Sequence, residues 1–196
     1  MKTILPVFLL FLTGCAAAVS QHATSQPVLR NLGPAPELTN TIWLNTPKPL
    51  HLADLHGKVI LLEMWTFDCI NCRHTIPQLN SWYQTYASQG LVIIGNHFPE
   101  FPVEADLNNL KQAVKELGIQ YPVAQDNQGV TWNAYENSYW PTMYLIDKTG
   151  HIRYLRIGEG GYDITKSAIQ ELLAEKQQYL SENYGRTTPV FRIGPK

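Results

Sequence analysis

The sequence has 196 residues, which favours one compact domain with short extensions. Hydrophobic residues make up 44% and charged residues 16%, a composition that supports a buried core and excludes a wholly disordered chain. The formal net charge of −1 offers no basic excess to neutralise a phosphate backbone, so we expect no nucleic-acid partner.

The first fourteen residues have the pattern of an export signal. Lys2 supplies a positive charge, and an apolar run covers residues 4–12. This run is shorter than the roughly twenty residues that cross a bilayer, so we interpret residues 1–14 as a signal peptide. Residues 12–15 resemble the bacterial lipobox, which predicts lipidation of Cys15 and anchoring to the bacterial cell envelope. The alternative is an ordinary secretory signal that is cleaved a few residues later.

The next residues predict a tether. Residues 15–36 are rich in Ala, Ser, Gln, Thr and Pro, and we interpret them as a flexible link between the anchor and the domain. The domain itself is expected at 37–180, followed by a tail at 181–196.

The first half of the domain begins with an irregular stretch. We expect residues 37–58 to form a short hairpin or extended segment at the domain edge. Residues 59–65 form a continuous apolar run, which predicts a central strand covered on both faces, and Glu63 is the one charged residue in it. A helix is predicted at 69–87, and a second buried strand at 91–95.

The second half alternates helices with strands. Apolar residues spaced 4-3-4-3 over residues 103–117 predict an amphipathic helix. Residues 121–124 contain a proline and are expected as a short edge strand. A helical turn is predicted at 130–135, a β-hairpin at 143–157 and a closing helix at 164–173. This order predicts an α/β fold in which helices cover both faces of a mixed central sheet.

Two cysteines lie where the first strand meets its helix. Cys69 and Cys72 are one helical turn apart, which places both sulfurs on one face and permits a disulfide. The free N–H groups at a helix start favour a thiolate, so we expect Cys69 to attack and Cys72 to resolve. Two alternatives remain: a structural disulfide, which constrains so short a loop little, and a copper site that includes His74.

Residues 65–72, the dipeptide Trp140–Pro141 and the hairpin after it resemble the thioredoxin superfamily. The similarity is strongest to TlpA/ResA-like thiol–disulfide oxidoreductases and to the C-terminal domain of DipZ proteins. It implies a thioredoxin-like fold with an N-terminal extension and an insertion after the second strand. It also implies that Pro141 is cis.

The resemblance also implies a set of site residues. Glu63 stands six residues before Cys69, at the place of thioredoxin's buried aspartate. There it is expected to have a raised pKa and to take the proton of Cys72. The alternative is a glutamate at the solvent-exposed rim. The resemblance further assigns substrate contacts to a set beside the cysteines: Trp65, Ile70, Asn71, Trp140 and Pro141. His97 is expected to be an ordinary loop histidine.

These inferences together predict a thiol–disulfide oxidoreductase that reduces protein disulfides through a mixed disulfide. Its redox group is the Cys69–Cys72 pair itself, and we expect no other cofactor and no metal. The resemblance implies a membrane electron donor of the DsbD/CcdA type. One alternative is a thiol peroxidase, because Thr66 and Cys69 satisfy a T-x-x-C pattern. Another is a copper-binding or chaperone protein without enzymatic activity.

Overall fold

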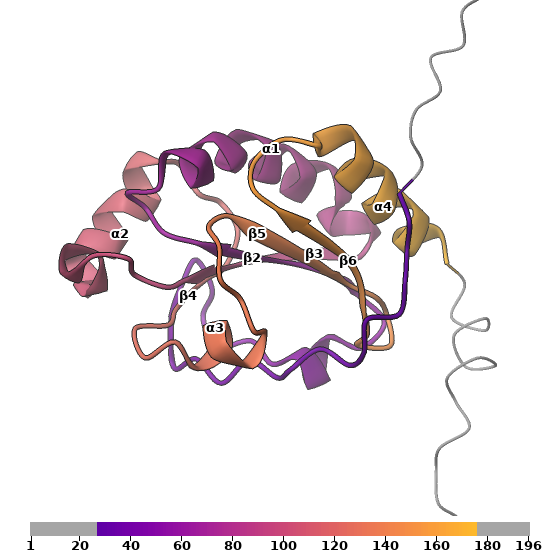
Figure 1. Ribbon diagram of the computed structural model, residues 1–196, viewed down its shortest axis with the longest axis horizontal. Coiled ribbons are helices and arrows are strands. Elements are labelled where there is room, and N and C mark those ends of the chain that lie inside the picture. The colour runs from indigo at the N-terminus through magenta and orange to yellow at the C-terminus, as the bar shows by residue number, and fades with distance from the viewer. Residues whose placement is uncertain (1–26, 176–196) are drawn as a thin grey trace, which may run out of the picture.

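The computed structural model describes residues 27–175 (Figure 1). The predicted signal peptide, the lipidation site Cys15 and the tail at 181–196 lie outside these residues. Within residues 27–175, every helix is too short or too polar to cross a bilayer.

A six-stranded mixed sheet forms the centre of the fold, with the order β1-β4-β3-β2-β5-β6. The strands are β1 (Ile42–Leu44), β2 (Val59–Trp65), β3 (Leu91–His97), β4 (Val123–Gln125), β5 (Thr142–Ile146) and β6 (Ile152–Ile157). The three strands β2, β3 and β4 run parallel to one another, whereas β1, β5 and β6 pair antiparallel with their neighbours. The predicted α/β class and the hairpin before the last helix are confirmed.

Helices cover both faces of this sheet. They are α1 (Ile70–Tyr86), α2 (Leu107–Glu116), α3 (Val130–Ala134) and α4 (Tyr162–Ala174). In Figure 1, α1 and α4 lie above the sheet, while α3 and the 3-10 turn Leu52–Leu55 lie below it. Short 3-10 turns also follow α1 at Ala87–Gln89 and precede α2 at Pro102–Ala105.

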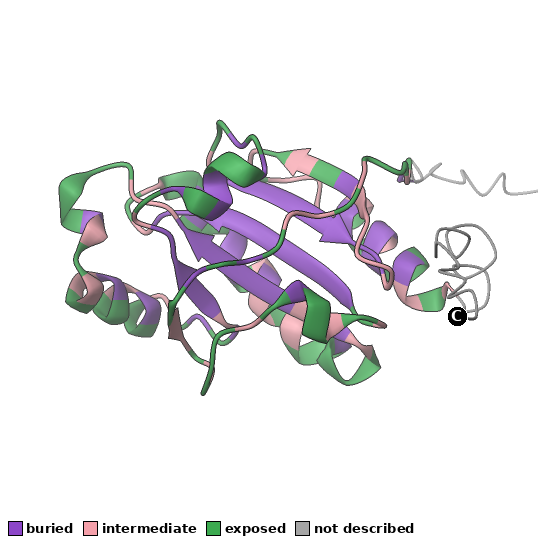
Figure 2. Ribbon diagram, turned by 90° about the horizontal axis from the view of Figure 1, so that it is seen from below, coloured by how far each residue is buried: buried purple, intermediate pink, exposed green. Residues whose placement is uncertain are grey.

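The central strand β2 is buried along its whole length, as Figure 2 shows for the middle of the sheet. Successive side chains of a strand point to opposite faces. Val59, Leu61 and Trp65 therefore join the core beneath α1, whereas Ile60, Leu62 and Met64 join the core on the α3 side. Burying one such aliphatic side chain stabilises the fold by roughly 1.5–3 kcal/mol. Glu63 has the parity of the first set and so points toward α1.

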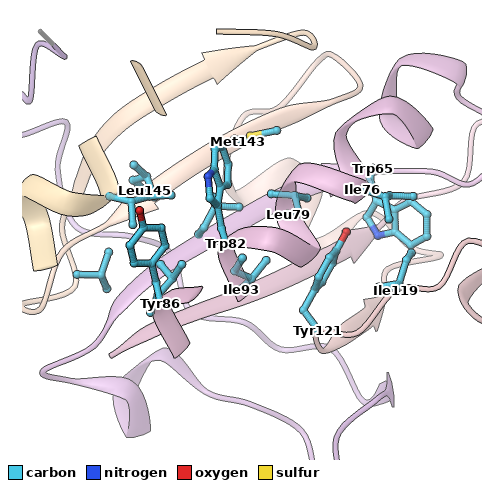
Figure 3. Close-up of a cluster of buried hydrophobic side chains, with 14 of the residues drawn as sticks. Trp65, Ile76, Leu79, Trp82, Tyr86, Ile93, Ile119, Tyr121, Met143 and Leu145 are labelled. Carbon is cyan, nitrogen blue, oxygen red and sulfur yellow. The ribbon is translucent and has the colours of Figure 1, made fainter. Parts of the chain in front are cut away.

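The core beneath α1 is built from one stripe of that helix. Ile76, Leu79, Trp82 and Tyr86 recur every three or four residues and are all buried. Figure 3 shows these side chains above the strands, with Trp65 and Tyr121 together at one end of the cluster. Because this stripe fixes α1 on the sheet, it also fixes the place of the helix start that carries Cys69 and Cys72.

Two elements differ from the sequence-based expectation. The segment expected as an edge strand is β4, which lies inside the sheet because β1 pairs with its outer side. β1 forms no hairpin of its own. The helix expected from residue 103 starts only at Leu107, because the Asp106 carboxylate accepts hydrogen bonds from the N–H groups of Asn108 and Asn109 at 2.8 and 3.0 Å.

The described part of the predicted tether also lies against the domain. Arg30, Leu32 and Ala35 each donate a backbone hydrogen bond to the segment 150–153, at 2.8–3.0 Å. The segment therefore continues along the outer side of β6, where unpaired backbone groups are available. From Arg30 onward the chain is part of the folded structure, seven residues before the expected start of the domain at residue 37.

Candidate active site at the start of α1

The two thiols differ in exposure. Cys69 is the N-cap of α1 and is partly exposed, whereas Cys72 is fully buried in the first turn. The N–H group of Cys72 donates to the Cys69 sulfur at 3.3 Å. Between them, Ile70 is 59% exposed and Asn71 is exposed, so both face solvent beside the outer sulfur. A partner molecule can therefore reach Cys69 but not Cys72.

Glu63 lies beneath these thiols and has no contact with solvent. Its carboxyl group is 2.5 Å from the Thr75 hydroxyl and accepts a second hydrogen bond from the Tyr121 hydroxyl at 3.4 Å. Burial raises the pKa of Glu63 to about 8, although the bonds from Thr75 and Tyr121 lower it in part. The alternative of a rim glutamate is excluded, because this side chain is completely enclosed.

Thr75 connects this carboxyl group to the buried cysteine. Its hydroxyl oxygen is 2.5 Å from Glu63 Oε1 and 2.6 Å from the Cys72 carbonyl oxygen. The Thr75 hydroxyl has one hydrogen, which it shares between these two acceptors. Thr75 therefore links Glu63 directly to the backbone of the buried cysteine.

Cys72 is held in its thiol form by the same surroundings. Burial raises the pKa of Cys72 far above its ordinary value, and the nearby charge of Glu63 raises it further. A buried thiol of this kind does not ionise by itself at neutral pH. It becomes a nucleophile only when a neighbouring group accepts its proton.

A protein-family model covers the residues of this site. The family model described as AhpC/TSA matches residues 33–155, which include both thiols, Glu63, all of β5 and most of β6. The chain belongs to the AhpC/TSA family.

Some relatives of this AhpC/TSA chain are named thiol-disulfide oxidoreductases. It is 42% identical over 178 residues to Protein DipZ of Mycobacterium tuberculosis, a match that covers 88% of this chain and 26% of DipZ. The chain therefore spans about a quarter of the length of that relative. It is 30% identical over 148 residues to the thiol-disulfide oxidoreductase YkuV of Bacillus subtilis, covering 74% of this chain and 97% of YkuV.

The fold agrees with solved structures. A crystal structure of a thioredoxin-like superfamily protein superposes with a TM-score of 0.68 and 31% identity, covering 73% of this chain and 97% of the other. The resemblance to the thioredoxin superfamily is thereby confirmed at the level of fold.

The dipeptide before β5 has the expected geometry in this AhpC/TSA chain. The Trp140–Pro141 peptide bond is cis. Met64 of β2 pairs with Thr142 of β5 in an antiparallel ladder, so Pro141 lies at the end of β2 from which the chain continues to Cys69. The cis bond and the cysteine pair therefore share one end of the sheet.

The Trp140 side chain is held by other aromatic rings. Its Nε1 donates to the Phe98 carbonyl oxygen at 3.1 Å, and its ring centroid lies 4.4 Å from that of Trp132. Trp140 is only partly buried, so one part of the ring remains available to a partner. Pro141 itself is buried.

Trp65 was predicted to contact the substrate, and the structure contradicts this prediction. The side chain is 0% exposed, and its indole lies against Gly95. Figure 3 shows Trp65 inside the cluster of buried side chains near Tyr121. A residue in the core beneath α1 cannot touch a partner protein. The alternation of side chains along β2 already predicts this burial, because Trp65 lies on the same face of the strand as Val59 and Leu61.

His97 also differs from expectation. It is the last residue of β3, not a loop residue, and it is fully buried. Its ring stacks on Phe67 with centroids 5.4 Å apart, and its Nε2 lies 3.3 Å from the Thr66 hydroxyl. Burial lowers the pKa of His97 to about 4, although the charge of Glu104 opposes this shift. His97 is therefore neutral at physiological pH.

The structure does not bring His74 and the two cysteines together as a metal site. His74 is exposed, and its Nδ1 lies 2.9 Å from the Glu159 carboxylate. Among residues 27–175, no three His, Cys, Asp or Glu side chains gather closely enough to hold a metal ion.

Proposed function

We propose that this chain is a thiol–disulfide oxidoreductase that reduces disulfides of other proteins through Cys69 and Cys72. The observation that carries the proposal is the unequal exposure of the two sulfurs at one helix start. One sulfur is open to a partner, and the other is buried one turn away. The names of YkuV and of other relatives support the same activity.

The reaction has two steps that balance. The Cys69 thiolate attacks one sulfur of the substrate disulfide, forms a mixed disulfide, and the other substrate sulfur leaves as a thiolate. Cys72 then loses its proton and attacks the Cys69 sulfur, which forms the Cys69–Cys72 disulfide and releases the second substrate thiol. The substrate gains two electrons and two protons, and the cysteine pair loses them. A membrane dithiol donor of the DsbD/CcdA type restores the reduced pair by the reverse exchange.

Glu63 is the group that we propose to accept the Cys72 proton. A general base works best when its pKa lies near the operating pH, and burial raises the pKa of Glu63 to about 8. The ionised fraction accepts a proton in the second step and returns it when the pair is reduced again.

The thiol-peroxidase alternative has less support. A peroxidase threonine in the T-x-x-C pattern needs to face a peroxide at the cysteine. Thr66 is fully buried, and its hydroxyl donates to the Glu104 carboxylate. We therefore favour disulfide exchange as the activity.

We further propose that the protein acts outside the cytoplasm as a lipoprotein. The apolar run and lipobox-like residues before Cys15 support export and a lipid anchor on the bacterial cell envelope. An anchor of this kind places the domain beside a membrane electron donor.

Trapping tests the proposed activity. We expect full-length Cys72→Ser to accumulate mixed disulfides with envelope proteins, because Cys69 still attacks and no resolving thiol releases the partner. Non-reducing gels followed by mass spectrometry measure these adducts, with Cys69→Ser as the matched control. If neither variant forms adducts and the parent protein does not reduce insulin, the proposed activity is wrong. If only Cys69→Ser forms adducts, the roles of attacker and resolver are reversed.

A further inference from the structure

Glu104 is a buried carboxylate that the exchange mechanism described above does not use. It lies in the 3-10 turn before α2, thirty-five residues after Cys69, and is 0% exposed. Its two oxygens accept four hydrogen bonds: from the Thr66 hydroxyl, from the Asp68 N–H at 3.0 Å, and from the Glu100 and Phe101 N–H groups at 2.7 and 2.8 Å.

These donors keep the side chain charged. Burial by itself would raise the pKa of Glu104, but the hydrogen bonds from Thr66 and from the three N–H groups lower it below its usual value. A buried charge is stable only when its hydrogen-bonding capacity is filled. A glutamine cannot replace this arrangement, because its amide nitrogen donates and would face N–H groups at one of the two positions.

The two oxygens serve two different loops. Oε1 accepts from Thr66 and Asp68, which belong to the loop that leads directly into Cys69. Oε2 accepts from Glu100 and Phe101, in the loop that follows β3. Glu104 therefore ties the peptide before the attacking cysteine to a loop that is more than thirty residues away in the sequence.

The second loop leads into the 3-10 turn Pro102–Ala105, which lines a groove next to the peptide that precedes Cys69. Its side chains Phe101 and Val103 are 52% and 53% exposed, so both are accessible to a partner protein. Val103 lines a groove of about 330 Å³ together with Phe67, Asp68 and Arg73, three residues that flank the cysteine pair. The Glu104 bonds connect the loop on one side of this groove to the peptide that precedes Cys69.

Thr66 also connects Glu104 to His97, whose protonation state can be measured by NMR. Because the Thr66 hydroxyl hydrogen is donated to Glu104, the contact between Thr66 and His97 Nε2 at 3.3 Å requires the hydrogen of His97. Neutral His97 therefore carries its hydrogen on Nε2 and donates it to Thr66. The position of the hydrogen on the His97 ring therefore indicates whether the hydrogen bonds between Glu104, Thr66 and His97 are intact.

We propose that Glu104 is a positioning residue for disulfide exchange: its carboxylate holds the peptide that precedes Cys69 against the loop that carries Phe101 and Val103, so that a protein disulfide meets the attacking sulfur in one defined orientation. This inference rests on the proposed oxidoreductase function.

The test compares Glu104→Gln with Glu100→Gln. Both variants remove one negative charge from the same loop, but the Glu100 side chain is exposed and accepts none of the four bonds. We expect Glu104→Gln to lower kcat/KM for insulin reduction about tenfold or more, because bonds to a charged acceptor are lost. Glu100→Gln is expected to stay within about twofold of the parent, since single exposed charges contribute little. Equal rates for the two variants would overturn the proposal.

A second measurement separates positioning from loss of local structure. In ¹⁵N NMR spectra at pH 6, His97 of the parent is expected to be neutral with its hydrogen on Nε2. If Glu104→Gln loses activity while His97 stays neutral, the core is intact and the positioning role is supported. If His97 of the variant titrates near its ordinary pKa of 6.5, water has entered, and the role is only structural.

The parent protein distinguishes failure of this inference from failure of the proposed function. A parent that reduces insulin, combined with a fully active Glu104→Gln, contradicts only the role of Glu104. A parent without disulfide exchange contradicts the proposed function, on which the inference depends.

Discussion

Glu63 shows how one residue sets both a stability cost and a chemical capacity. β2 places it on the face beneath α1, where Val59, Leu61 and Trp65 otherwise fill the core. A carboxylate in that place loses its hydration, which is why the folded protein holds the side chain protonated. The same unfavourable burial brings the pKa of Glu63 close to the working pH of a proton acceptor.

Glu63 therefore gives the stability a defined pH dependence. Its pKa is about 8 in the folded protein and about 4.5 in an ordinary glutamate. Between these values the folded chain keeps a proton that the unfolded chain releases, so the free energy of unfolding falls as the pH rises from 4.5 to 8. The loss is on the order of 3–5 kcal/mol.

For Glu63→Gln we expect this pH dependence to flatten, because the amide does not titrate, while insulin reduction slows. Urea unfolding of the reduced protein at pH 5, 6.5 and 8 measures the first effect. The exposed Glu171→Gln is the matched control and is expected to leave the slope unchanged. Parallel stability curves for the parent and Glu63→Gln would show that Glu63 is not the group that titrates.

Strand β3 illustrates how an element leaves space for the site. Gly95 pairs with Glu63 of β2, and a Cβ atom at Gly95 would lie 2.8 Å from Trp65 Nε1 and 3.2 Å from the Tyr121 ring. Real Cβ atoms essentially never come as close as 2.8 Å to another heavy atom, so the absence of a side chain at Gly95 lets both aromatic rings close over the strand. Through Tyr121, which donates to Glu63, this packing also reaches the carboxyl group.

Gly95→Ala is consequently expected to destabilise the protein by about 1–3 kcal/mol, because the added methyl group overpacks a filled core. Urea unfolding measures the change. In a Trp65→Phe background the penalty is expected to shrink, since the indole Nε1 is removed. An unchanged penalty in the double variant would place the clash at Tyr121 instead.

At the scale of the whole molecule, the segment that precedes the predicted domain completes the sheet edge. Arg30, Leu32 and Ala35 donate backbone hydrogen bonds to residues 150–153, and the Tyr135 hydroxyl donates to the Pro36 carbonyl oxygen at 2.9 Å. The segment thus contacts both the β6 hairpin and the end of α3.

A chain that starts at Glu37 is therefore expected to be less stable than a chain that starts at Pro27, by roughly 2–6 kcal/mol for four backbone hydrogen bonds, the fourth donated by Ile152 to the Gly33 carbonyl oxygen. Thermal and urea unfolding of the two truncated proteins measure the difference. Identical stability would mean that this segment contributes no net free energy, and that the functional boundary lies near residue 36.

Several parts of the fold were predictable because their signals are local. The apolar run of β2, the hairpin of β5 and β6, and the Cys69–Cys72 spacing are each read from fewer than twenty consecutive residues. Trp65 was assigned wrongly although its parity along β2 was visible, because its position beside the site residues outweighed the alternation. The N-terminus of α2 was displaced by a single capping residue, Asp106.

The partners of the site residues were not predictable. Glu104 is 38 residues from Thr66, and Tyr121 is 58 residues from Glu63, so that no local pattern joins either pair. Of these partners, only Thr75 could be expected from the sequence near Cys72, since it follows Cys72 by three residues and so lies on the same face of α1.

The sequence by itself determined which chemistry this protein carries: two sulfurs one helical turn apart, after a strand whose single charge is Glu63. The tertiary structure decided which sulfur is exposed, that Glu63 is neutral, and that Glu104 is charged. The physical reason is that hydration and hydrogen bonding depend on atoms from distant segments. Burial under α1 favours the neutral form of one carboxyl group, while four donors from two loops favour the charged form of the other.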